Sequence, residues 1–82
     1  MKLDFDIDKF SGNYLLKFNV DQFKSDIDHK MAITIVTCVS LDYDLDPELE
    51  VEDMQDILDK TLELGKEEFT FEIGEDGIEV DI

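Results

Sequence analysis

Apolar and polar residues alternate strictly at both ends of the chain. Segment 3–8 reads apolar, acidic, apolar, acidic in turn, and segment 14–20 repeats the alternation with Tyr14, Leu16 and Phe18 on one side. A period of two places the apolar residues on one face of a strand and the polar residues on the other. Since turn-forming residues occupy positions 11–13, the pattern predicts a first hairpin.

The C-terminal part predicts a helix followed by a second hairpin. Asp46 and Pro47 suit the cap and the first position of a helix, an apolar stripe from Val51 to Leu62 follows at helical spacing, and Gly65 marks its end. Segments 69–73 and 78–82 then alternate with a period of two around the four-residue turn 74–77. We therefore predict an amphipathic helix packed on a sheet, and two further strands.

The middle of the chain is less regular. Residues 21–30 leave two interpretations open, a short helix capped by Asp21 or an extended hairpin arm with a bulge. Segment 31–45 is apolar on both faces as far as Val39, which is typical of a central strand covered on both sides.

Together these elements predict a single domain, residues 1–82, of the α+β class. The expected sheet is small and mostly antiparallel, with about five strands in the order βββαββ and one amphipathic helix on one face.

The net charge of the chain is unusual for a small domain. The chain has 82 residues with 23 Asp and Glu against seven Lys, and its formal net charge is -16. Comparable domains carry charges of magnitude ~2–8. An acidic disordered tail is the first alternative, but 43% hydrophobic residues and a single proline supply a packed core.

The carboxylates are expected to gather on two surfaces. Like charges at opposed or helically adjacent positions reduce stability, and here few lysines relieve them. On the predicted strands and hairpin, acidic residues alternate with the core set, also at Glu72, Glu79 and Asp81, and on the helix they recur at intervals of four, three and four. An ordinary solvated face is the alternative interpretation. The candidate partner-binding residues are Asp4, Asp6, Asp8, Asp42, Asp44, Glu52, Asp56, Asp59 and Glu63.

These rows favour a basic protein as partner, one whose surface normally holds nucleic acid. Carboxylates two apart on a strand are ~6.6 Å from each other, which suits lysines and arginines placed for phosphates. In size and charge the chain resembles the small acidic inhibitors that phages use against host nucleases and restriction or CRISPR effectors. The leading hypothesis is a DNA mimic, such as an anti-CRISPR or anti-restriction protein. The alternative is an immunity protein or antitoxin that neutralises a basic nuclease toxin.

Two other classes receive less support. Asp4-x-Asp6-x-Asp8 and the 42–46 repeat resemble the start of a calcium loop, but neither has the required Gly and Glu at its sixth and twelfth positions. For catalysis the chain offers His29, expected in an exposed loop, and Cys38, expected in the core. We therefore predict no enzyme, no cofactor and no metal.

The remaining expectations concern location and assembly. No secretory leader opens the sequence, and its one cysteine forms no internal disulfide, which favours the cytoplasm, that of a phage-infected host if the inhibitor hypothesis holds. Anionic nucleic acid and membranes should repel the chain. The last strand is an expected sheet edge, so pairing of two copies into a homodimer is a further expectation.

Overall fold

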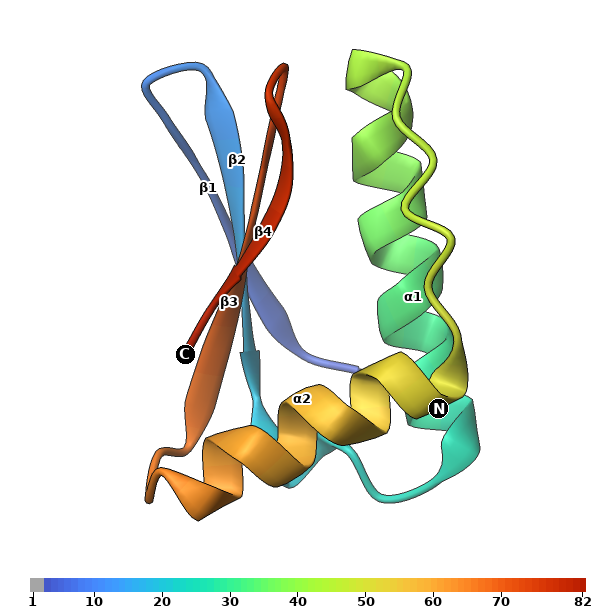
Figure 1. Ribbon diagram of the computed structural model, residues 1–82, viewed down its shortest axis with the longest axis vertical. Coiled ribbons are helices and arrows are strands. Elements are labelled where there is room, and N and C mark those ends of the chain that lie inside the picture. The colour runs from blue at the N-terminus through green and yellow to red at the C-terminus, as the bar shows by residue number, and fades with distance from the viewer. Residues whose placement is uncertain (1–2) are drawn as a thin grey trace.

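The computed structural model describes residues 3–82, which form one four-stranded sheet with helices on one of its faces (Figure 1). The strands are antiparallel and lie in the order β1-β2-β3-β4, so each hairpin forms one half of the sheet. The α+β class and both hairpins are confirmed. The elements in chain order are β1 Phe5–Phe10, β2 Asn13–Asn19, the 3-10 turn η1 Val20–Gln22, α1 Asp26–Ser40, the 3-10 turn η2 Leu41–Tyr43, α2 Val51–Glu63, β3 Glu68–Gly74 and β4 Gly77–Asp81.

The core lies between the inner face of β2 and β3 and the two helices. Phe18 is its centre, since its ring packs 5.7 Å from that of Phe69 and 6.0 Å from that of Phe71. The helices contribute buried residues at intervals of three and four, which the apolar stripe predicted for α2. The buried apolar residues are Leu3, Leu16, Phe18, Ala32, Val36, Met54, Leu58, Phe69, Phe71 and Ile73.

β1 is less buried than its alternation suggests. Phe5 is half-buried and stacks on Phe18, but Ile7 is 50% exposed although it points to the inner face. The helices pack over the centre of the sheet, and β1 lies at its edge. The alternation therefore predicted correctly which β1 side chains face the core, but not how deeply they are buried.

The predicted central strand over 31–45 is wrong, because this segment forms α1 and η2. Its β-branched residues favour a strand by propensity, but the buried positions Ala32, Val36 and Ser40 recur every four residues. Small side chains at two of them let the helix approach the sheet closely. Segment 21–30 matches neither interpretation, since η1 ends at Gln22 and α1 begins only at Asp26.

The start of α1 is fixed by a buried carboxylate. Asp28 accepts hydrogen bonds from the backbone N–H groups of Lys24 at 2.9 Å and Ser25 at 3.1 Å. The signal was present in the sequence as Ser25-x-x-Asp28 before an apolar run, which is typical of a helix start.

α2 is the predicted amphipathic helix, but it begins at Val51 rather than at Pro47. Asp46 accepts a hydrogen bond from the backbone N–H of Glu48 at 3.3 Å, and Glu48 has a left-handed φ of 49° that no helix allows. Asp46 therefore closes a turn instead of capping a helix. The helix starts instead where Asp53 accepts from the N–H of Glu50 at 2.8 Å. The predicted end at Gly65 is confirmed, since α2 stops at Glu63 and Gly65 has a φ of 71°.

Candidate functional site

The outer face of the sheet, turned away from both helices, carries most of the strand carboxylates. Strand pairing brings Asp6, Lys17, Thr70 and Asp81 into one row across the four strands. The next row on this face is Asp8, Leu15, Glu72 and Glu79. By the alternation of β1 and β3, Asp4 and Glu68 belong to the same face. We name these carboxylates the acidic sheet face; they are Asp4, Asp6, Asp8, Glu68, Glu72, Glu79 and Asp81.

Glu72 and Glu79 are directly opposite each other on β3 and β4. Opposed side chains start from Cβ atoms ~4.5–5.5 Å apart, so two negative charges here disfavour the pairing. Glu72 accepts a hydrogen bond from the side-chain amide of Asn13 at 2.7 Å. Because this donor is neutral, it does not compensate the negative charge of Glu72. Among the described residues, Lys17 and Glu68 form an ion pair on this face at 3.4 Å. Both side chains are about half exposed.

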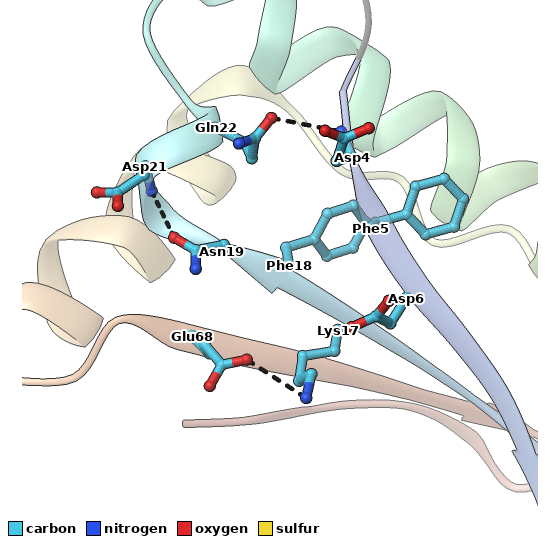
Figure 2. A pocket seen from close by; sticks show the side chains of 9 residues that line it. All are labelled: Asp4, Phe5, Asp6, Lys17, Phe18, Asn19, Asp21, Gln22 and Glu68. Atoms are coloured by element: carbon cyan, nitrogen blue, oxygen red, sulfur yellow. Dashed lines mark hydrogen bonds and ion pairs between the residues drawn. The ribbon is translucent and has the colours of Figure 1, made fainter.

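A hollow of about 450 Å³ opens where this face meets η1 (Figure 2). Its polar rim includes Asp4 and Asp6 from β1, Asp21 from η1 and Glu68 from β3. Two backbone N–H groups are held by neutral side chains here, that of Asp21 by Asn19 at 2.9 Å and that of Asp4 by Gln22 at 3.5 Å. Among the described residues, the ion pair at this rim is the one between Lys17 and Glu68.

Apolar groups interrupt the acidic sheet face. Leu15 is half-buried between Asp8 and Glu72 in its row. Phe10, which shares the outer face with Asp8 by alternation, is 69% exposed. Phe10 therefore offers apolar contact area beside the carboxylates of this face.

The helix row Glu52, Asp56, Asp59 and Glu63 is exposed along α2, as predicted, but it belongs to the helix side of the molecule. Asp59 accepts a hydrogen bond from Gln55 at 2.9 Å. A single cation, Lys60, lies in the last turn of α2. The two predicted surfaces thus exist but do not form one continuous patch.

Asp42 and Asp44 do not lie on the sheet. They fall in η2 and just after it, where Asp44 takes a left-handed φ of 56° and closes the end of α1. Figure 1 places this turn at the opposite end of α1 from α2. The run of acidic residues from 42 to 59 is therefore divided in space, because segment 44–50 returns along the length of α1.

The two candidate catalytic residues lie on opposite sides of α1. His29 is buried, not in an exposed loop: its ring nitrogens lie 2.8 Å from the carbonyl of Ser25 and 3.0 Å from Oε1 of Gln55. Cys38 is exposed, not in the core. Nine helical residues turn the chain through about two and a half turns, so the two side chains diverge.

Two further properties bear on function. Across residues 3–82, no cluster of three or more His, Cys, Asp or Glu side chains is placed to hold a metal ion. Asp4, Asp6 and Asp8 follow an extended segment, so they do not converge on one point as calcium ligands do. None of the helices in the described part of the chain has both the length and the apolar character needed to cross a bilayer.

Comparison with known proteins found no matching family model, no matching curated protein and no matching solved structure.

Proposed function

We propose that the protein is an acidic inhibitor that covers the basic, nucleic-acid-binding surface of a target protein through its acidic sheet face. The observation that carries this proposal is the opposed pair Glu72 and Glu79 within a face of seven carboxylates and one lysine. A face that served only solubility would gain stability from alternating signs. Two carboxylates at opposed positions, which reduce stability, support a role of this face in contact with cations.

The dimensions of the face support this proposal. Four strands ~4.8 Å apart give a width of ~14 Å, and the carboxylates along β1 repeat every ~6.6 Å. A rigid array on this scale can meet several lysines and arginines of a nucleic-acid groove at once. Binding by such an array is steered by charge, so it is fast at low salt and weakens as salt rises.

Two apolar side chains add contact area to the charged face. Phe10 and Leu15 offer contact area that does not depend on salt, and aromatic side chains commonly anchor protein interfaces. The proposed action is the occlusion of a binding site and involves no chemical reaction. A cytoplasmic target such as a nuclease or a restriction or CRISPR effector is consistent with it.

The test begins with capture of target proteins from bacterial lysate at low salt and their elution with NaCl. Each captured protein is then bound to fluorescent duplex DNA, and the anisotropy is followed as this protein is added. The unmodified chain should displace the DNA. The outer-face variant Asp6→Asn/Glu72→Gln/Glu79→Gln should need about tenfold more protein, mainly through slower association.

The matched control is Glu52→Gln/Asp56→Gln/Asp59→Gln on α2, which removes the same charge from the other surface. It should displace DNA nearly as well as the unmodified chain. Equal losses from both variants would indicate nonspecific acidity. DNA that stays bound while this protein also binds would exclude the proposed occlusion.

A further inference from the structure

The solvent side of α1 carries fewer charges than the outer surface of α2. The outward positions recur at intervals of four, three, four and three, and they are Ile27, Met31, Thr34, Cys38 and Leu41. Met31 is half-buried and also packs against the core. Ile27 is 58% exposed and Leu41 is 63% exposed. The buried residues Ala32, Val36 and Ser40 lie on the opposite side of the helix. We name the outward set the α1 stripe.

Most of the α1 stripe also lies in a segment without carboxylates, which is unusual for this chain. From His29 to Leu41 no carboxylate occurs, in a chain with 23 of them, and Lys30 is the one charged residue of that segment. A hollow of about 320 Å³ lies along the stripe, lined by Ile27, Lys30, Met31, Thr34 and Ile35. Figure 1 shows α1 beside one face of the sheet. The acidic sheet face is the opposite face, so it is separate from the α1 stripe.

We propose that the α1 stripe is the contact between two copies of this chain, packed as antiparallel helices. Intervals of four and three are the spacing by which two helices interlock along a seam. A two-fold axis uses every contact twice, so a stripe of uncharged side chains can complement itself. A basic partner would gain nothing from a surface without carboxylates, whereas a second copy meets no carboxylate between His29 and Leu41.

Charge selects the antiparallel orientation. Lys30 lies near the start of α1, and Asp42 and Asp44 follow its end. Antiparallel helices bring Lys30 of each copy to the acidic end of the other, whereas parallel helices bring the two lysines together. The matching register sets Met31 opposite Leu41 and Thr34 opposite Cys38 of the second copy. It spans ~15 Å of helix at a rise of 1.5 Å per residue.

This proposal is independent of the proposed function, and salt separates the two. The acidic surfaces of two copies repel each other, and added salt screens that repulsion, so NaCl should strengthen the dimer. The same salt should weaken the binding of a basic target. A homodimer through the edge of β4 would not respond to changes on α1.

The first experiment measures the mass of the full chain by sedimentation equilibrium over a range of protein concentrations. The expected result is a monomer-dimer equilibrium. The outward variant Thr34→Glu, at an exposed position of the stripe, should shift the mass to that of a single chain, with an unchanged circular dichroism spectrum. The control Glu63→Gln, on the exposed side of α2, should leave the dimer unchanged. A monomer at every concentration, or a dimer unaffected by Thr34→Glu, would overturn the proposal.

The second experiment tests orientation through the natural thiol. Under mild oxidation, a mixture of the unmodified chain with Thr34→Cys/Cys38→Ser should give a cross-linked dimer. Each protein alone should not, since Cys38 lies about a turn from Cys38 of the second copy in the proposed register. Cross-linking of the unmodified chain alone would indicate parallel helices, and absence of a cross-link in the mixture would exclude the register. Either result would overturn the antiparallel arrangement.

Discussion

The opposed carboxylates Glu72 and Glu79 give the most direct test of the idea that the acidic sheet face reduces stability. We predict that Glu79→Lys stabilises the protein, because it replaces a like-charge cross-strand pair with an opposite one. Two unit charges ~6 Å apart in water interact by ~0.7 kcal/mol. Removing the repulsion and adding the attraction therefore gains ~1 kcal/mol after screening. In a domain of this size that raises Tm by ~4–8 °C.

Urea unfolding followed by circular dichroism, at low and high NaCl, measures the effect. The matched control is Glu75→Lys, which changes the net charge equally but lies in the turn before β4, where no carboxylate faces it across the ladder. The difference between the two variants should shrink as salt reduces the Debye length from ~10 Å at 0.1 M to ~3 Å at 1 M. Equal stabilities at low salt, or a difference that persists at high salt, would refute the reasoning.

Three further predictions follow from charge and geometry. The Tm of the unmodified protein should rise with NaCl in a thermal melt, because screening relieves self-repulsion at a charge of -16; a flat response would contradict this. Asp28→Ala should cost ~1–2 kcal/mol in urea unfolding, since two backbone N–H groups lose their acceptor, and the exposed neighbour Asp26→Ala should cost less. Gly74→Ala should destabilise, because its Cβ would lie 2.0 Å from Oδ1 of Asn13. In an Asn13→Ala background the same change should cost less, and a double-mutant cycle measures the difference.

The parts of the fold that the sequence predicts well are those where one period dominates. Both hairpins combine a period of two with obvious turn residues, and α2 combines helical spacing with acidic residues on its outer side. In these elements, local pattern and tertiary burial agree. The acidic alternation on β1 and on the second hairpin could be assigned to one face for the same reason.

α1 was mispredicted because its β-branched residues favour a strand and its helical pattern is weak. Periodicity distinguishes a helix from a strand only when the polar side is clear, and in α1 the exposed residues Ile27 and Cys38 interrupt that side. The capping pattern at Ser25 and Asp28 was the remaining signal, and it also explains why His29 is buried one residue later. The separation of Asp42 and Asp44 from the other carboxylates could not be inferred, since it depends on where the chain turns back.

The sheet ends in two open edges, since within residues 3–82 no further strand pairs with β1 or β4. Unpaired edges invite other chains to add strands, which is the first step toward fibrils. Carboxylates on both edge strands make such an approach of one molecule to another unfavourable. If the proposed function holds, the side chains that keep these edges apart are also those that contact the target. Any variant that neutralises the acidic sheet face must be checked for aggregation by light scattering before a loss of binding is assigned to recognition.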